Sequence, residues 1–262
     1  MSTAFTDSLY SIADGIGHVV FNRPQSRNAL TFEMYAHLAD ICRNVPTDGS
    51  LRAIVISGAG GKAFAAGTDI SLFRDFKGAD SGVEYEEKMA VHLGTIEACP
   101  IPMIAAMTGA CTGGGAAIAA CCDLRIASAD MKFGFPIART LGNCLSAANL
   151  AKLASLLGPA RVTEIIFTSR LMTADEAKAA GLVTEVLPDH DATVARAMEL
   201  ARQVASMAPI TLRVTKELLR RVQKDGASAH DEDMVRLAYG SRDFREGLES
   251  FLAKRPPQWS GR

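Results

Sequence analysis

The feature that most constrains this chain is an uncharged segment in the middle of the sequence. No charged residue occurs from Ala98 to Cys122. The segment is long enough to cross a bilayer, but Pro100, Pro102 and the run Gly113–Gly115 interrupt it, and such breaks are poorly compatible with a membrane helix. We therefore expect a buried strand, a glycine turn and a buried alanine-rich helix inside a globular core, and no membrane span.

Composition supports a globular protein. The chain has 262 residues, of which 48% are hydrophobic, which excludes a disordered or fibrous chain. Its 28 Lys and Arg nearly cancel its 29 Asp and Glu, so no excess of positive charge is available to bind nucleic acid. No signal peptide is visible at the N-terminus, and the cytoplasm is the expected location. The six cysteines form no CxxC pair, so we expect neither a disulfide framework nor a metal site.

The order of strand and helix patterns predicts an α/β core. Apolar runs typical of strands are "HVVFN", "RAIVIS", "PMIAAM", "DLRIAS" and "LVTEVLP", and helical patterns separate them. These runs lack polar alternation, which indicates strands buried on both faces and joined by right-handed crossovers. On the residues alone we expect a doubly wound parallel sheet. Beyond Asp191 only three or four helical patterns remain, so we divide the chain into a core, 1–190, and a helical region, 191–262.

Two glycine turns are candidates for a site. The turns in "AAGTDI" and "TGGGAA" each follow a strand-like segment, and the second opens a helix whose first amides have no internal partner. Two convergent N–H groups would polarise a carbonyl and hold the enolate formed from it, as in an oxyanion hole. The alternative is that both turns serve only tight packing.

A second candidate is "GNCLS", from Gly142 to Ser146, which resembles a nucleophile elbow with Cys144 as the nucleophile. Its last position is serine, and the sequence identifies no base for it. The alternative is that Cys144 is a small buried side chain before a helix. Among the histidines, only His92 is a candidate acid or base.

Taken together, these motifs resemble the enoyl-CoA hydratase/isomerase (crotonase) family over nearly the whole chain. The resemblance depends on segments that occur in order: "HVVFNRPQSRNAL", "LRAIVISGAGGKAFAAGTDI", "PIPMIAAMTGACTGGGAAIAACCDLRIASADMKFGFP", "LMTADEAKAAGLVTEVLP" and "FREGLESFLAKRPPQW". It implies a spiral core of repeated strand-strand-helix turns that binds an acyl-CoA thioester as substrate, with no permanently bound cofactor. It also implies that the C-terminal helices form a homotrimer or a dimer of trimers.

The resemblance also assigns roles to individual residues. The backbone amides of Thr68 and Gly114 match the oxyanion hole, where the Thr68 hydroxyl would narrow the pocket. Residues matching the CoA groove are Arg27, Ala29, Ala65, Asp69 and Ile70. Phe251 and Lys254 match positions that reach the CoA of a neighbouring subunit, although Lys254 also fits a solvated charge at a helix end.

The chain departs from the family where a hydratase carries two catalytic glutamates. Those places hold Ala117 and Ile137, or Ala138 if the register shifts by one residue. Apolar side chains cannot transfer protons. Dehalogenase-type members place a nucleophilic carboxylate close to the position of Cys144, and Arg139 is the only charge between Lys132 and Lys152.

Three functions therefore stay open. The first is an acyl-CoA lyase or isomerase whose proton-transfer groups are not the usual glutamates. The second is a CoA-thioester binding protein without catalysis. The third is a thioester hydrolase or dehalogenase-like enzyme that uses Cys144.

Overall fold

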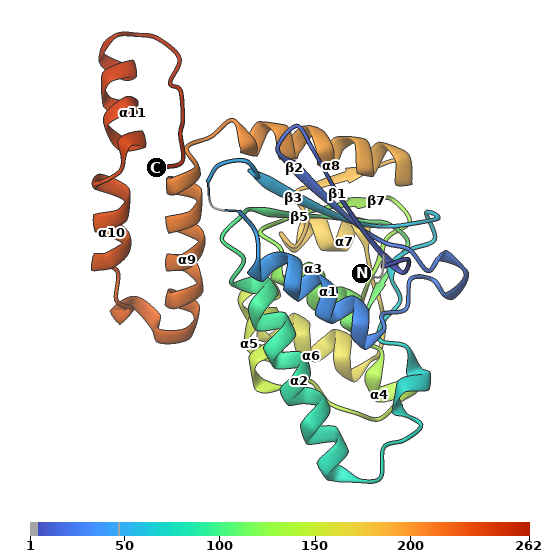
Figure 1. Ribbon diagram of the computed structural model, residues 1–262. Helices are drawn as coiled ribbons and strands as arrows, with labels where there is room; N and C mark the ends of the chain where they lie inside the picture. The colour runs from blue at the N-terminus through green and yellow to red at the C-terminus, as the bar shows by residue number, and fades with distance from the viewer. Residues whose placement is uncertain (1–4, 47) are drawn as a thin grey trace.

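In the computed structural model, which describes residues 5–46 and 48–262, the chain forms two β-sheets surrounded by helices (Figure 1). The larger sheet has the strand order β1-β2-β3-β5-β7-β10, and every neighbouring pair except β1–β2 is parallel. Its strands are β1 (Ser8–Ala13), β2 (Ile16–Phe21), β3 (Ala53–Gly58), β5 (Met103–Met107), β7 (Leu124–Ser128) and β10 (Glu185–Leu187). The five strands expected from the sequence are confirmed as β2, β3, β5, β7 and β10.

The smaller sheet was not anticipated from the sequence. It has the order β4-β6-β8-β9, in which β4, β6 and β8 are parallel and β9 is antiparallel to β8. Its strands are β4 (Ala63–Ala65), β6 (Ala110–Thr112), β8 (Lys132–Gly134) and β9 (Met172–Thr173). Segments of two or three residues are too short for an alternation pattern, so these stretches resemble loops in the sequence.

The path between the two sheets is a spiral. The strand order of each sheet increases steadily with chain position, and β3, β5 and β7 in one sheet are followed directly by β4, β6 and β8 in the other. A doubly wound sheet would reverse its strand order near the middle, so that expectation is wrong. The repeated strand-strand-helix turns implied by the family resemblance are the observed architecture.

Helices fill the connections and cover the sheets. Thr31 caps the first long helix by accepting from the Met34 amide, and Thr173 and Glu176 form a capping box at the start of α7. The helices are α1 (Phe32–Arg43), α2 (Ala79–Glu97), α3 (Gly114–Cys121), α4 (Ile137–Thr140), α5 (Ala147–Leu157), α6 (Pro159–Phe167), α7 (Ala174–Ala179), α8 (His190–Ala205), α9 (Pro209–Asp225), α10 (Glu232–Tyr239) and α11 (Arg242–Leu252), with short 3₁₀ turns at Pro24–Ser26, Ile70–Phe73 and Gly226–Ser228.

The central strands of the larger sheet, β3 and β5, are buried on both faces, as the missing alternation predicts. In β3, Ile54 and Ile56 belong to the main core shared with α1, α2 and α3, whereas Val55 packs on the opposite side. That opposite side is covered by α8, whose Ala197 and Ala201 are fully buried against the sheet. Successive residues from Ala53 to Ile56 thus face two different apolar layers, and all four are hydrophobic.

The C-terminal helices divide between the core and a projecting arm. α8 lies across the larger sheet, while α9, α10 and α11 stand beside the core as a separate group (Figure 1). The expected boundary after residue 190 therefore separates α8 from the sheet it covers, and by packing the projecting region begins at α9. Short side chains such as Ala197 and Ala201 let α8 approach the sheet closely, a role that its helical pattern alone did not reveal.

The end of the chain returns to the core and ties this arm to it. Buried Asp243 accepts hydrogen bonds from the amides of Ser260 and Gly261 at 2.7 and 2.9 Å, and Arg52 donates to the Trp259 carbonyl at 3.0 Å. Within the described residues, no helix is both long enough and apolar enough to cross a membrane.

Candidate active site

The two glycine turns meet at one edge of the smaller sheet. β4 ends just before Gly67, and β6 ends just before Gly113. Because β4 and β6 are parallel neighbours, their carboxyl ends lie side by side. A β-carbon built on Gly113 would lie 3.4 Å from the Gly67 α-carbon. The smaller sheet is therefore what brings together two turns that are distant in sequence.

Each turn presents a backbone amide without a partner. Leu30 forms a parallel bridge with Thr68: it donates to the Gly67 carbonyl at 2.8 Å, and its carbonyl accepts from the Asp69 amide at 2.9 Å. The amide of Thr68 itself takes no part in this bridge. Gly114 is the first residue of α3, where no helical acceptor exists. Within residues 5–46 and 48–262, neither the Thr68 amide nor the Gly114 amide has a hydrogen-bond acceptor.

Glycine is required at Gly114 by close packing. A β-carbon built there would lie 1.7 Å from the Tyr35 hydroxyl and 3.0 Å from Thr68 Oγ1. No real β-carbon approaches oxygen so closely, so any other residue would displace Tyr35 or the start of α3. Gly113 just before it has φ 51°, a left-handed conformation that favours glycine.

These amides border a pocket with a cavity volume of about 180 Å³. α1 contributes Tyr35, α2 contributes Tyr85 and Glu86, and α3 contributes Ala117. Hydroxyl groups form a chain across it, because Thr68 Oγ1 lies 2.9 Å from Tyr35 Oη and 3.1 Å from Tyr85 Oη. The Thr68 hydroxyl that was expected to narrow the pocket is thus held between two tyrosines.

Glu86 is the only charged side chain that lines this pocket among the described residues. It is half-buried, and burial raises the pKa of its carboxyl above the usual range. Its Oε2 accepts a hydrogen bond from the Ser146 amide at 3.2 Å.

Glu86 is not among the site residues expected from the sequence, although the sequence carries a signal for it. Met89, Leu93 and Ile96 are the buried residues of α2. Glu86 lies three residues before Met89 and seven before Leu93, which places it on the same face of the helix. A lone carboxylate on an apolar helix face is the pattern that would have identified it.

A wider apolar groove of about 760 Å³ adjoins the pocket and shares Phe73, Tyr85 and Leu141 with it. Cys144 lines this groove and is exposed, so the expectation of a buried small side chain is wrong. The connection between α4 and α5 has no regular secondary structure and is exposed around Cys144, which keeps the thiol in solvent. Within the described chain, no Lys, Arg or His lines the pocket or the groove.

Other candidates divide between the pocket and the surface. Ala117 and Ile137 line the pocket, whereas Ala138 is exposed and does not. Arg139 is also exposed, because α4 turns Ile137 and Thr140 toward the pocket and carries Arg139 on another face. His92 lies on α2 outside the pocket, and neither of its ring nitrogens has a hydrogen-bond partner in the described part of the chain.

The residues predicted for the CoA groove gather beside the first turn. The Arg27 carbonyl accepts from the Ala66 amide at 3.0 Å, and Arg23 donates both to the Ala29 carbonyl at 2.7 Å and to Asp69 at 3.0 Å. Ile70, also predicted, is 60% exposed and lines the pocket.

Ala65, in contrast, is fully buried within β4. A β-carbon built on Gly115 would lie 2.7 Å from the Ala65 side chain. The Ala65 methyl group therefore packs against α3 and does not face the predicted CoA groove.

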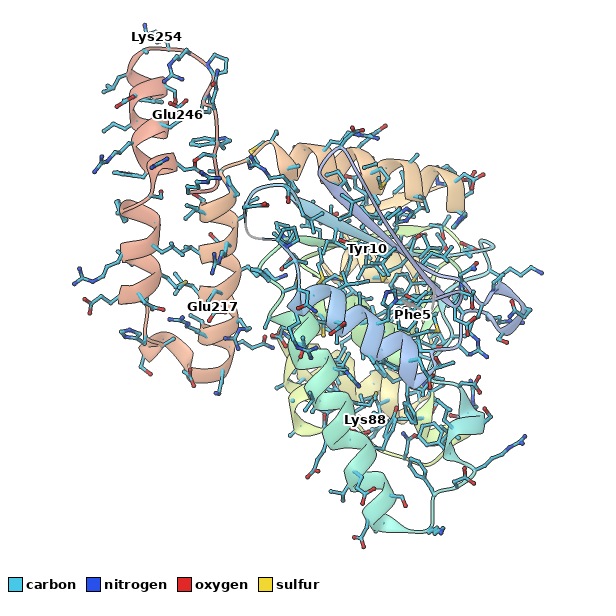
Figure 2. All side chains as sticks on the ribbon, in the orientation of Figure 1. Phe5, Tyr10, Lys88, Glu217, Glu246 and Lys254 are labelled. Atoms are coloured by element: carbon cyan, nitrogen blue, oxygen red, sulfur yellow. The ribbon has the colours of Figure 1, made fainter. Side chains whose placement is uncertain are left out.

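Phe251 and Lys254 lie far from this pocket within the chain. Figure 2 shows Lys254 at the outer end of the projecting arm, on the opposite side of the molecule from Lys88 of α2. Phe251 is 82% exposed. Its neighbours on the arm include several other exposed hydrophobic residues: Tyr239, Phe244, Leu248 and Leu252.

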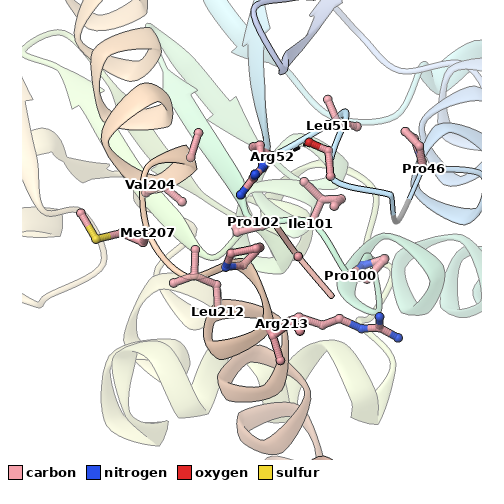
Figure 3. A pocket seen from close by; sticks show the side chains of 15 residues that line it. Pro46, Leu51, Arg52, Pro100, Ile101, Pro102, Val204, Met207, Leu212 and Arg213 are labelled. Atoms are coloured by element: carbon pink, nitrogen blue, oxygen red, sulfur yellow. Dashed lines mark hydrogen bonds between the residues drawn. The ribbon is translucent and has the colours of Figure 1, made fainter. Parts of the chain in front are cut away.

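Another cavity has a volume of about 50 Å³ and is smaller than the pocket (Figure 3). It lies at the end of the larger sheet where β3 and β5 begin. It is formed where Leu51 and Pro102 precede β3 and β5 and where Met207 joins α8 to α9. Ligand sites of parallel sheets lie at the carboxyl ends of strands, and this cavity lies at the amino ends. Among the described residues, no group of His, Cys, Asp and Glu is arranged to hold a metal ion.

The fold is an α/β spiral of two sheets, and within the described residues two backbone amides without acceptors border its pocket. The sequence profile of the enoyl-CoA hydratase/isomerase family matches residues 11–262, and the chain belongs to this family.

Individual relatives cover nearly the same length. The chain is 33% identical to a "Probable enoyl-CoA hydratase" of Mycobacterium bovis, over 94% of this chain and 95% of that protein. It is 30% identical to the 2,3-dehydroadipyl-CoA hydratase of Escherichia coli, over 93% and 94%. The crystal structure of an enoyl-CoA hydratase/carnithine racemase from Magnetospirillum magneticum has a TM-score of 0.89 and 35% identity, over 98% and 97% of the two chains.

Proposed function

We propose that this protein is a lyase or isomerase that processes acyl-CoA thioesters through an enolate held by the backbone amides of Thr68 and Gly114. The observation that carries the proposal is the pair of unpartnered N–H groups at one pocket edge. In a water-poor site, two such donors stabilise a developing oxyanion strongly, each contributing about 3–4 kcal/mol in a well-studied enzyme. Family membership makes a CoA thioester the substrate that fits.

The chemistry differs from that of a family hydratase. Water addition needs an acid and a base, and the two matching pocket positions hold Ala117 and Ile137. We therefore expect weak hydration or none, and reactions that begin with removal of a proton beside the thioester carbonyl.

The CoA itself is proposed to lie along Arg27, Ala29, Ala65, Asp69 and Ile70. The burial of Ala65 restricts its part to backbone contacts. In a homotrimer or a dimer of trimers, Phe251 and Lys254 of a neighbouring subunit would complete this groove. The exposed apolar residues of α10 and α11 support association through the arm.

A panel of enoyl-, 3-hydroxyacyl-, acyl- and aryl-CoA thioesters tests the proposal. Turnover of at least one of them is expected. Thr68→Pro removes the amide donor, and Thr68→Ala removes only the hydroxyl. The proline variant is expected to lose about 100- to 1,000-fold in kcat, and the alanine variant far less. Circular dichroism checks that both variants are folded. Absence of turnover by the native protein across the panel contradicts the proposal.

A second candidate is a CoA-thioester binding protein without catalysis, which the apolar Ala117 and Ile137 favour. Binding by calorimetry with no turnover of any thioester would identify it. Hydrolysis through Cys144 is less well supported, because no Lys, Arg or His among the described residues lines the groove beside this thiol.

A further inference from the structure

Among the described residues, the pocket contains a single group that can act as a base near neutral pH. Its other titratable lining residues in the described chain are Tyr35 and Tyr85. Burial raises the pKa of both phenols, and the nearby negative charge of Glu86 adds to the effect. The two tyrosines therefore stay protonated near neutral pH and do not act as bases. Among the described residues that line the pocket, Glu86 alone can accept a proton.

Glu86 is held so that one carboxylate oxygen stays available. Oε2 accepts from the Ser146 amide at 3.2 Å, and Oε1 has no hydrogen-bond partner within the described residues. Ser146 also begins α5, with its hydroxyl accepting from the Asn149 amide at 3.4 Å. The amide that orients Glu86 is thus anchored by a helix, which limits motion of the carboxylate.

The hydroxyl chain across the pocket has a hydrogen to spare. Tyr35, Thr68 and Tyr85 carry three O–H groups, and two hydrogen bonds join them. Whichever way these bonds run, one hydroxyl hydrogen is left to donate outside the chain. When Tyr35 is the residue with the spare hydrogen, this donor lies beside the α-carbon of Gly114 and close to the proposed oxyanion site.

We propose that Glu86 is the catalytic residue that exchanges a proton with the α-carbon of the bound acyl-CoA, in place of the glutamates absent at Ala117 and Ile137. The carboxylate takes the proton as the C–H bond breaks, and the electron pair becomes the C=C bond of an enolate. The enolate oxygen is held by the Thr68 and Gly114 amides. Protonated Glu86 then returns the proton to the α-carbon or, in an unsaturated acyl group, to the γ-carbon.

This inference rests on the proposed function and is tested separately from it. The experiment incubates butanoyl-CoA with the protein in D₂O and follows deuterium at the α-carbon by NMR. Glu86→Gln is compared with Glu84→Gln, which changes an exposed carboxyl on the same helix outside the pocket and groove. The native protein and Glu84→Gln are expected to exchange equally. Glu86→Gln is expected to lose about 100-fold or more, while calorimetry detects unchanged butanoyl-CoA binding.

A pH profile distinguishes proton transfer from a structural role. The groups that face Glu86 are Tyr35 from α1, Tyr85 and Glu87 from α2, and Cys144 from the α4–α5 connection. Exchange by the native protein should rise with pH as the Glu86 carboxyl ionises, and Glu86→Asp should restore part of the rate with this acid limb. A residual rate in Glu86→Gln should lack the limb.

The outcomes separate the two proposals. Full exchange in Glu86→Gln overturns the role of Glu86 and leaves the proposed function standing. If the native protein turns over other thioesters but does not exchange the α-carbon proton, the role of Glu86 is likewise overturned and the proposed function stands. Absence of both turnover and exchange in the native protein overturns both proposals.

Discussion

The two sides of the pocket are built in different ways. One side, the backbone wall, consists of the turns Gly67–Thr68 and Gly113–Gly114 and offers amide groups. The other, the side-chain wall, consists of Tyr85–Glu86 on α2 and the connection Leu141–Ser146, and it offers a carboxylate. The first sits at the ends of buried parallel strands. The second is made of a partly exposed helix and a connection without regular structure.

This difference separates two tasks of catalysis. A backbone amide donates whatever side chain its residue carries. Thr68 can therefore provide this donor as well as another residue would. Proton transfer depends entirely on the side chain: Ala117 and Ile137 cannot perform it, and in the proposed mechanism Glu86 does. A pocket of this design can change its reaction through the side-chain wall while its backbone wall remains intact.

The largest expected effect comes from adding one methyl group to the backbone wall. Gly114→Ala places a β-carbon 1.7 Å from the present position of the Tyr35 hydroxyl, so the start of α3 must shift. We expect kcat to fall about 100- to 1,000-fold through loss of one oxyanion donor. Gly94→Ala is the control, because its β-carbon meets nothing within 4 Å on α2. Equal activity of both variants would contradict the oxyanion role.

Arg125 holds the end of α3, the helix that begins with Gly114 of the backbone wall. Its buried guanidinium donates to the carbonyls of Ala119 and Cys122 at the end of α3 and to that of Leu182 at 2.8 Å. Arg125→Met removes the donor to the Cys122 and Leu182 carbonyls, and we expect a loss of about 3 kcal/mol in the free energy of unfolding, measured with urea. The exposed Arg139→Met should change it by less than about 0.5 kcal/mol. A small effect at Arg125 would show that α3 is held by packing alone.

On the side-chain wall, Ser146 allows the pKa of Glu86 to be changed without touching Glu86. The φ of Ser146 is −61°, which suits proline, so Ser146→Pro removes the amide donor with little backbone strain. Loss of that hydrogen bond disfavours the carboxylate and raises its pKa. The acid limb of kcat/KM should move to higher pH than in Ser146→Ala, which loses only the hydroxyl. Coincident limbs would contradict the role of this amide.

Glu86 itself should have a small cost for folding. Burial raises its pKa in the folded protein, so its contribution to stability is full below the unfolded pKa and is lost as the pH rises through the folded pKa. Glu86→Gln should therefore melt about 1–2 °C higher than the native protein at pH 8, and the difference should shrink toward pH 5. Glu84→Gln, measured by the same calorimetric scans, should show no such trend.

The smallest effect is expected at Cys144. The thiol is exposed, and no basic side chain of the described residues lines its groove. Cys144→Ser should leave thioester hydrolysis and α-carbon exchange unchanged within about twofold, because neither step uses this sulfur. If Cys144→Ser stays folded but loses hydrolysis, the thiol takes part in that reaction and the prediction is wrong.

Much of the fold and part of the site could be predicted from the sequence. The apolar runs without polar alternation predicted five strands of the larger sheet, because a strand that is buried on both faces does not alternate apolar and polar residues. The glycine turns predicted two backbone amides at one pocket edge, because the first turn of a helix leaves its amides without internal acceptors. Glu86 was not predicted, since a single carboxylate on an apolar helix face has no motif of its own.

By itself, the sequence determined the buried strands and the family, and it carries Ala117 and Ile137 where the family resemblance predicts two glutamates. The tertiary structure alone decided which distant residues meet. The short strands β4 and β6 carry too few residues to show a pattern, yet their parallel pairing places Thr68 beside Gly114. The packing of α2 and the α4–α5 connection beside that edge then brings Glu86 into the same pocket. Contacts of this kind depend on the path of the chain between sheets, which no local propensity encodes.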